Sequence, residues 1–247
     1  EIYNLAAQSF VGASFQQPIL TADITGLGVL RVLEAIKENA PDAKFYQASS
    51  SEMYGNYPGE KNEASPFIPR SPYGAAKVFG HHITNHYREA YNIFACCGIL
   101  FNHESPLRGL EFVTRKITYE LALIKNKKQE KFKLGNIYAK RDWGFAGDYV
   151  EAMWLMLQQK QPEDYVISTG ESHSVEDFLN LATEFSELGD WKNLVEIDKS
   201  ILRPTDIDDL VGDSSKARTQ LGWKPKMNFR QLVKSMVEHD LEFVKTH

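Results

Sequence analysis

The chain has 247 residues, of which 43% are hydrophobic and 12% aromatic, and its formal net charge is -5 at pH 7. This apolar and aromatic content supports a folded core and argues against a disordered chain. The negative net charge argues against nucleic-acid binding, which needs a basic stripe. No apolar run approaches the ~20 residues that cross a bilayer, so we expect neither a nucleic-acid partner nor a membrane partner.

The first fifty residues predict a strand, a helix and a second strand. Residues 2–5 form a short run that ends in small side chains, and residues 21–40 carry leucine and isoleucine at helical spacing. Residues 44–48 include aromatic and apolar side chains and are followed by a run of serines, as in a short buried strand. Strands that alternate with helices are typical of α/β folds with a parallel sheet.

Two pairs of polar residues flank the proline-rich loop after this second strand. Ser50 and Glu52 stand before the loop, and Tyr73 and Lys77 stand after it, four residues apart at the start of a helix predicted over residues 73–91. An ammonium group favours the phenolate form of a tyrosine, whose ordinary pKa is near ~10, so this pair can act as a base. Surface packing and turn formation are the common explanations of such residues. Their place at the carboxyl end of a strand, where open α/β sheets bind ligands, favours a functional site.

A second polar cluster, with Asn102 and His103, follows the apolar run of residues 93–101, which predicts a central strand. A lone histidine is more often a hydrogen-bonded structural residue, but its place at a strand end favours a function. Cys96 and Cys97 are neighbours in that run and point to opposite faces of a strand, which predicts buried thiols and a reducing cytoplasm. No set of residues has the spacing of metal ligands, so we expect no metal.

Beyond Gly109 the alternation of strands and helices becomes less regular. Ser174 begins the sequence S-V-E-D, which suits a helix N-cap. The apolar spacing predicts helices over residues 112–125, 148–158, 175–188, 214–221 and 229–244, and strands over residues 132–134, 165–168 and 195–197.

Several segments together resemble one enzyme family. They are YNLAAQS (3–9), SSSEMYG (49–55), SPYGAAK (71–77), GILFNHESPLRG (98–109), FVTRKI (112–117), RDWGFAGDYV (141–150) and GWKP (222–225). With these segments the sequence resembles the extended short-chain dehydrogenase/reductases, which modify nucleotide sugars, and within them the GDP-mannose 4,6-dehydratases. The resemblance implies an α/β Rossmann-like, doubly wound parallel sheet with its N-terminal part missing. Residues 1–109 would form part of the dinucleotide-binding domain, and residues 110–247 mainly a smaller substrate-binding α/β lobe, with some segments returning to the first domain.

The activity that the resemblance implies is that of a lyase. GDP-mannose would become GDP-4-keto-6-deoxymannose and water through oxidation at C4, elimination across C5 and C6, and return of the hydride to C6. Tyr73 would take the O4 proton with its pKa lowered by Lys77, and Ser50, at a position where relatives usually have threonine, would hydrogen-bond the same oxygen. Glu52 would take the C5 proton, which distinguishes a dehydratase from an epimerase or a ketoreductase.

The ligand-binding residues are likewise implied by the resemblance. The cofactor would be NADP, with NAD not excluded, and Leu107 stands where many relatives have a second arginine. Relatives associate through helices such as those of residues 21–40 and 73–91, which implies a homo-dimer or homo-tetramer. The cofactor would contact Leu5, Ala6, Ala7, Gln8, Ser9, Lys77, His103 and Arg108, and the GDP portion would contact Asn102, Lys116, Arg141, Arg203 and Asp206.

The glycine-rich turn that opens a dinucleotide-binding sheet does not occur in the sequence. By resemblance, residues 2–5 correspond to the fourth strand of the family. We therefore expect a fragment rather than a short homologue, because an open sheet edge would expose apolar faces and unpaired backbone groups. Two other interpretations stay open: an epimerase or reductase of the same family, and a non-catalytic nucleotide-sugar-binding fragment.

Overall fold

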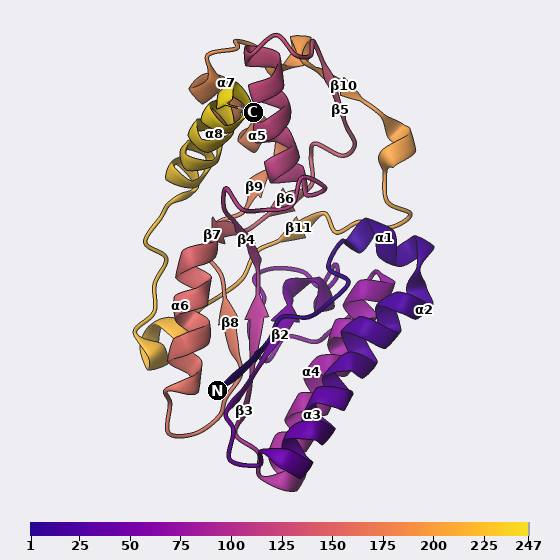
Figure 1. Ribbon diagram of the computed structural model, residues 1–247, viewed down its shortest axis with the longest axis vertical. Helices are drawn as coiled ribbons and strands as arrows, with labels where there is room; N and C mark the ends of the chain where they lie inside the picture. The colour runs from indigo at the N-terminus through magenta and orange to yellow at the C-terminus, as the bar shows by residue number, and fades with distance from the viewer. Residues whose placement is uncertain (247) are drawn as a thin grey trace.

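The structure is a computed structural model and describes residues 1–246. Every residue of its two central strands is buried, which is typical of parallel strands covered on both faces. The carboxyl ends of these strands meet at one edge of the sheet, where Ser50 is paired in register with Leu100. The main sheet has four parallel strands, in the order β1 (Ile2–Asn4), β2 (Phe45–Ser50), β3 (Ala95–Leu100) and β8 (Tyr165–Ile167) (Figure 1).

Helices cover both faces of this sheet. α3 (Gly28–Asn39) and α4 (Pro72–Tyr91) pack on one face, and α6 (Ala146–Leu157) packs on the other, as the right and left sides of Figure 1 show. The start of α4 is encoded locally, because Ser71 Oγ accepts the backbone N–H of Gly74 at 3.0 Å and a proline fills the first helical position. This cap fixes the first turns of α4 beside the end of β2.

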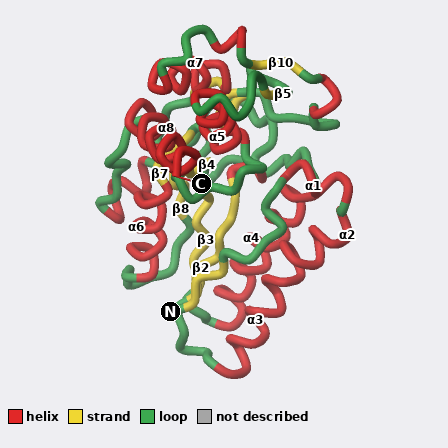
Figure 2. The backbone as a smooth tube through the Cα atoms, turned by 45° about the horizontal axis from the view of Figure 1, so that its top comes forward, coloured by secondary structure: helices red, strands yellow, loops and turns green. Residues whose placement is uncertain are grey.

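A second group of helices lies beyond the carboxyl ends of β2 and β3. α5 (Val113–Lys125), α7 (Val175–Ser186) and α8 (Phe229–Thr246) pack together around one apolar core. The parallel pair of β5 (Phe132–Leu134) and β10 (Val195–Ile197) lies beside them. Figures 1 and 2 both show this group at the opposite end of the molecule from the N-terminus.

Short strands lie between the two groups of elements (Figure 1). β4 (Asn102–Glu104) pairs in parallel with β7 (Trp143–Phe145). A three-stranded sheet has the order β11 (Asp209–Leu210), β6 (Lys140–Arg141) and β9 (His173–Ser174). The other short elements are α1 (Val11–Gln16), α2 (Pro18–Thr21), the π-helical η1 (Ala22–Leu27) and η5 (Ala217–Leu221), and the 3-10 segments η2 (Ser51–Met53), η3 (Trp191–Asn193) and η4 (Lys199–Ile201).

The predicted α/β class with a parallel sheet is confirmed, and so is the N-cap at Ser174, whose side chain accepts the backbone N–H of Asp177. The structure differs from the prediction at η1, where the first part of the helix predicted over residues 21–40 is π-helical. It also contains α1, α2 and the short strands β4, β6, β7, β9 and β11, which the sequence pattern did not predict.

The division into residues 1–109 and 110–247 stays a prediction. α6 and β8 follow residue 109 in the sequence and nevertheless pack with the main sheet, as the expected return of some segments requires. Cys96 and Cys97 are both buried and free in β3, which confirms the prediction of buried thiols. Among the described residues, no helix combines the length and the apolar character needed to cross a bilayer.

Candidate functional site

A cavity of about 690 Å³ lies at the carboxyl ends of β2 and β3. The main sheet and the start of α4 form one side of it. The other side comes from α5 and from the segments around residues 134–141 and 201–206. The cavity is therefore enclosed by parts of the chain that are far apart in sequence, at the edge of the sheet where open α/β folds bind ligands.

All four predicted catalytic residues, Ser50, Glu52, Tyr73 and Lys77, line this cavity. Ser50 ends β2, and its Oγ accepts the backbone N–H of Glu52 at 3.2 Å. This contact caps η2, the 3-10 segment that carries Glu52 on the cavity wall. Tyr73 and Lys77 lie on the first two turns of α4, one turn apart, so their spacing of four residues places both at the cavity as predicted.

Burial dominates the electrostatics of the tyrosine–lysine pair. It raises the pKa of Tyr73 to about 12, although a hydrogen bond with Ser50 acts to lower it. Burial lowers the pKa of Lys77 to about 8, and its Nζ donates to the backbone carbonyl of Ala48 at 2.8 Å. The Lys77 Nζ lies 5.7 Å from the centre of the Tyr73 ring. The expectation that Lys77 brings Tyr73 to a pKa near neutrality is therefore not met in this structure, because removal of the phenol from water outweighs the hydrogen bond with Ser50 and the charge of Arg108.

The segment after β1, predicted to contact the cofactor, lies only in part on the cavity wall. Leu5, Ala7 and Ser9 line the cavity, whereas Ala6 and Gln8 do not. The Ala6 N–H donates to Asn4 Oδ1 at 3.3 Å, and the Gln8 N–H donates to Thr25 Oγ1 at 3.0 Å. The two residues outside the cavity wall thus have structural hydrogen bonds instead.

The two other predicted cofactor residues, His103 and Arg108, also line the cavity. His103 Nδ1 lies 2.9 Å from the carbonyl oxygen of Phe101, and the imidazole stacks on the ring of Tyr149 at a centroid distance of 5.0 Å. Burial lowers the pKa of His103 to about 4, so the imidazole is neutral at pH 7. Arg108 Nε is buried without a hydrogen-bond partner of good geometry.

The predicted substrate residues form a charged wall near Glu52. Arg141 and Arg203 both approach the carboxylate of Asp206, at 3.0 and 3.6 Å, and Arg203 Nη1 lies 4.0 Å from Glu52 Oε1. Arg203 therefore links the expected GDP site to the expected elimination site. Asn102 and Lys116 complete the predicted set on the cavity wall.

Glu104 and Thr114 are a hydrogen-bonded pair among the polar wall residues that sequence reasoning missed. Glu104 ends β4 and is 2% exposed, and Thr114 Oγ1 donates to its carboxylate at 2.6 Å. Burial raises the pKa of Glu104, while the charge of Arg108 acts to lower it. A carboxylate three residues after the end of an apolar strand, and four residues before an arginine, is the signal in the sequence that could have identified Glu104.

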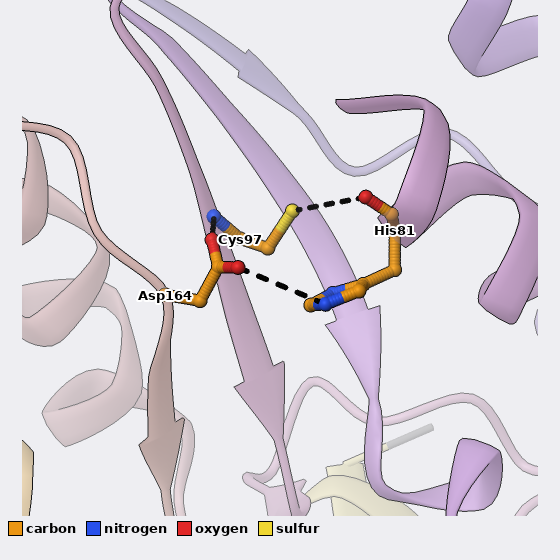
Figure 3. Close-up of side chains that lie close together, drawn as sticks. All are labelled: His81, Cys97 and Asp164. Atoms are coloured by element: carbon orange, nitrogen blue, oxygen red, sulfur yellow. Dashed lines mark hydrogen bonds and ion pairs between the residues drawn. The ribbon is translucent and has the colours of Figure 1, made fainter. Parts of the chain in front are cut away.

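One trio of possible metal ligands, His81, Cys97 and Asp164, lies within 4.8 Å in the part of the chain that the structure describes (Figure 3). His81 Nδ1 lies 3.1 Å from Ser49 Oγ, and the Cys97 backbone N–H donates to Asp164 at 2.8 Å. Arg88 donates to both carboxylate oxygens of Asp164, at 2.9 and 3.1 Å. Because a guanidinium already neutralises this carboxylate, we interpret the trio as a hydrogen-bonded network that ties α4 to β2 and β3.

Comparison with known proteins identifies the family. The family model described as GDP-mannose 4,6 dehydratase matches residues 1–236. GDP-mannose 4,6 dehydratase 1 of Arabidopsis thaliana is 57% identical over 249 residues, which cover 99% of this chain and 69% of the relative. GDP-mannose 4,6 dehydratase of Homo sapiens is 49% identical over 266 residues, which cover 100% of this chain and 72% of the relative.

Solved structures show the same fold. RMD from Pseudomonas aeruginosa complexed with NADPH matches with a TM-score of 0.88 at 21% identity, over 97% of this chain and 80% of that one. The UDP-glucose 4-epimerase of Thermus thermophilus in complex with NAD matches with a TM-score of 0.86 at 25% identity, over 96% of this chain and 76% of that one. From the match to the family model and the identity to its curated relatives, the chain belongs to the GDP-mannose 4,6-dehydratase family.

Proposed function

We propose that this chain is a lyase that converts GDP-mannose to GDP-4-keto-6-deoxymannose and water, with a nicotinamide dinucleotide as hydride carrier. The observation that carries the proposal is that Ser50, Glu52, Tyr73 and Lys77 all line one cavity. Two hydroxyls and a carboxylate at one place can serve an oxidation, which needs a base at O4, and an elimination, which needs a base at C5. Membership of the family supports the same reaction.

In the oxidation, Tyr73 takes the proton of O4 while Ser50 hydrogen-bonds the same oxygen. The phenol is protonated near neutrality at a pKa of about 12, so the reaction requires groups that favour the phenolate. The hydrogen bond with Ser50 is one of them. When bound, an oxidised nicotinamide supplies the hydride acceptor, a positive charge that further favours the phenolate, and later the hydride for C6.

In the elimination, the C4 ketone makes the C5 hydrogen acidic. Glu52 takes this proton and passes a proton to the C6 hydroxyl, which leaves as water. A proton returned to C5 balances the one taken from O4. Arg203, whose Nη1 lies 4.0 Å from Glu52 Oε1, places a positive charge beside this carboxylate. The proton that Tyr73 takes from O4 thus balances the proton that C5 gains, and the proton that Glu52 takes from C5 balances the one that leaves with the C6 hydroxyl.

The cavity wall fits a cofactor that carries phosphate. Arg108 lines the cavity, and its buried Nε makes no hydrogen bond and has only an ion-pair contact with Glu104 at 3.3 Å. A phosphate oxygen is a strong acceptor for a guanidinium. We propose NADP rather than NAD, as the resemblance implies. Solved neighbours in the comparison carry NADPH in one case and NAD in another, so both dinucleotides belong in the test. The residues that would hold the cofactor are Leu5, Ala7, Ser9, Lys77, His103 and Arg108.

We further propose a homo-dimer or homo-tetramer in the cytoplasm. An exposed apolar surface along α2, η1 and α4 supports self-association, and two free buried thiols support a reducing compartment. The apolar surface consists of Ile19, Leu20, Ile24, Leu27, Phe79 and Tyr91.

The test is to incubate the chain with GDP-mannose and NADP+, and separately with NAD+, and to follow the products by mass spectrometry. We expect a product that has lost one water and carries a ketone, and we expect Tyr73→Phe to abolish its formation. Titration calorimetry with GDP, NADP+ and NAD+ runs in parallel. Epimerised sugar without loss of water would favour the epimerase interpretation, and GDP binding without turnover would favour a nucleotide-sugar-binding protein.

A further inference from the structure

A buried ion pair joins α5 to α8 next to the cavity. Arg115 Nε lies 2.9 and 2.8 Å from the two carboxylate oxygens of Asp240, and Arg115 Nη2 lies 2.7 Å from one of them. Asp240 is fully buried and Arg115 is 8% exposed. Thr118 Oγ1 adds a hydrogen bond to Asp240 at 2.6 Å. The carboxylate is therefore fixed in position by residues of α5.

The other edge of the same guanidinium holds the turn between β4 and α5. Arg115 Nη1 donates to the backbone carbonyl of Pro106 and, at 3.1 Å, to that of Arg108. Within the turn, the Arg108 N–H donates to the Ser105 carbonyl at 3.0 Å. Leu107, at the tip of the turn, is 89% exposed, so the turn has little apolar packing of its own at that point. Besides the hydrogen bonds to Ser105 within the turn, the guanidinium of Arg115 is what ties its backbone to α5.

The side chain of Arg108 is held separately, at the cavity. Arg108 Nε lies 3.3 Å from Glu104, and its guanidinium carbon lies 3.5 Å from the centre of the Phe112 ring. Thr114, the residue before Arg115 in α5, donates to Glu104. The first turn of α5 thus fixes both parts of Arg108, the backbone through Arg115 and the side chain through Thr114 and Glu104.

A purely stabilising role is the simpler explanation of the Arg115–Asp240 pair. Buried ion pairs are, however, weak contributors to net stability, since the cost of removing two charges from water is large. The apolar contacts of α8 with α5 and α7 already attach the helix. What the apolar contacts cannot supply is the pair of donors that bind the turn.

We propose that Asp240, through Arg115, is a positioning residue that sets the place of Arg108 on the cavity wall. Asp240 lies more than a hundred residues after the turn in the sequence, but in the structure a single guanidinium, that of Arg115, contacts both. The proposal rests on the proposed function only in naming a dinucleotide phosphate as the ligand of Arg108.

The turn can be tested without any ligand, because trypsin can cut after Arg108 when the turn opens. We expect Asp240→Asn to speed cleavage between Arg108 and Gly109 by roughly tenfold, since a hydrogen bond to a charged group contributes about 1.5–3 kcal/mol and 1.4 kcal/mol is a factor of ten. Mass spectrometry identifies the cut. The matched control is Glu184→Gln, which removes an exposed ion pair between α7 and α8 and should leave the cleavage rate unchanged.

Arg115→Lys separates positioning from stability. A lysine keeps a positive charge for Asp240 but lacks the fork that reaches the two carbonyls. We expect it to speed the same cut as much as Asp240→Asn does, with a smaller fall in melting temperature. If Asp240→Asn fails to fold, the cleavage rate of Arg115→Lys alone tests the proposal. Cleavage at the rate of the unchanged chain in folded Asp240→Asn and Arg115→Lys would overturn the proposal.

The ligand arm uses NADPH and GDP in fluorescence and calorimetric titrations. Asp240→Asn and Arg108→Gln should each weaken NADPH binding by roughly tenfold, and the double variant should be no weaker than Arg108→Gln, because both act through one group. GDP affinity should stay within a factor of two. Additive losses would show that Asp240 does not act through Arg108. If the unchanged chain binds no NADPH, the cofactor assignment is refuted. The trypsin cleavage rates still test whether Asp240 positions the turn.

Discussion

Glu52 is the residue on which the reaction type depends. Its side chain is 14% exposed at the cavity, and the nearest charged group is Arg203. The neighbouring hydroxyl groups of Ser50 and Tyr73 can serve any oxidation at C4 of a hexose. Only a base near C5 turns the oxidised sugar toward loss of water, so the carboxylate is the part of the site that an epimerase would not need.

We expect Glu52→Gln to lower the formation of dehydrated product by about 10²–10⁴-fold, the usual contribution of a general base. GDP affinity should change by less than a factor of two, since Gln keeps the size of the side chain. Mass spectrometry of the sugar nucleotide and calorimetry with GDP measure the two quantities. The control is Glu60→Gln, an exposed carboxylate of the loop before α4. Dehydration at an unchanged rate in Glu52→Gln would assign the elimination to another residue.

Lys77 illustrates how burial at the site opposes stability. Its pKa falls from 10.5 to about 8 in the folded chain, so between these two pH values the unfolded chain holds a proton that the folded chain has released. Stability therefore rises with pH through this window and is lowest below pH 8. A shift of this size corresponds to roughly 3 kcal/mol at most.

We expect Lys77→Met to unfold at higher denaturant concentration than the unchanged chain at pH 7. The gain should be roughly 1–2 kcal/mol, because the buried charge is removed but the carbonyl of Ala48 loses its donor. The gain should shrink as the pH rises and should change sign above pH 10.5, where the lysine is neutral in both states and only the lost donor to Ala48 remains. Urea unfolding at several pH values measures it, with the exposed Lys224→Met as control. A gain that does not depend on pH would refute the electrostatic explanation.

At the scale of elements, strands β2 and β3 depend on one close approach. Gly98 of β3 faces Tyr46 of β2, and a Cβ at Gly98 would lie 2.2 Å from the tyrosine hydroxyl and 2.8 Å from its ring. Tyr46 is fully buried and has no room to move away. The glycine is therefore required by packing, not by its backbone angles.

Gly98→Ala should lower the free energy of unfolding by about 1–3 kcal/mol or more, the usual cost of an overpacked core. Gly28→Ala, in the first turn of α3, provides the opposite case. Its nearest neighbour is 3.7 Å away, so the added methyl group meets no clash and should stabilise the helix by roughly 0.5–1 kcal/mol. Urea unfolding of both variants checks the signs. Equal effects in the two would show that the close approach at Gly98 relaxes freely.

The elements that the sequence predicted are those with a local signal. α4 has a serine cap, a proline at its first position and a long apolar face, and α7 has the capping box of Ser174 and Asp177. β4, β6, β7, β9 and β11 are two or three residues long and exist only because distant segments pair with them. The predicted β5, β8 and β10 are just as short, but at least two of their three residues are apolar. The missed strands carry mostly polar residues or a glycine, so no apolar pattern marks them in the sequence.

At the scale of the whole molecule, the cavity exists only when the two groups of elements are together. The motif residues Ser50, Glu52, Tyr73 and Lys77 could be assigned from resemblance because they are close in sequence. Their electrostatics could not, since the burial that raises the pKa of Tyr73 comes from the complete fold. The approach of Arg203 to Glu52 joins residues that no local pattern relates, and so does the bond from Arg115 to Asp240.

The exposed apolar surface is the remaining feature of the whole molecule. Its members lie on α2, η1 and α4, which contact one another along one side of the structure (Figure 1). Ile19 is 85% exposed, and Leu27 and Phe79 are both more than 40% exposed. Apolar groups gathered in this way are typical of protein–protein contacts. A second copy of the chain is the occupant that the family resemblance implies.

We expect the unchanged chain to be a dimer or tetramer in light scattering after gel filtration, and Ile19→Glu combined with Leu27→Glu to be a monomer, because two carboxylates would lose their water in the contact. Circular dichroism should show the same helix content in both, since neither side chain is buried. Ile197→Glu, on β10 in the other group of elements, is the matched control and should leave the mass unchanged. If the unchanged chain is a monomer at every concentration, self-association is excluded for this chain. If the variant has the same mass as the unchanged chain, self-association uses another surface.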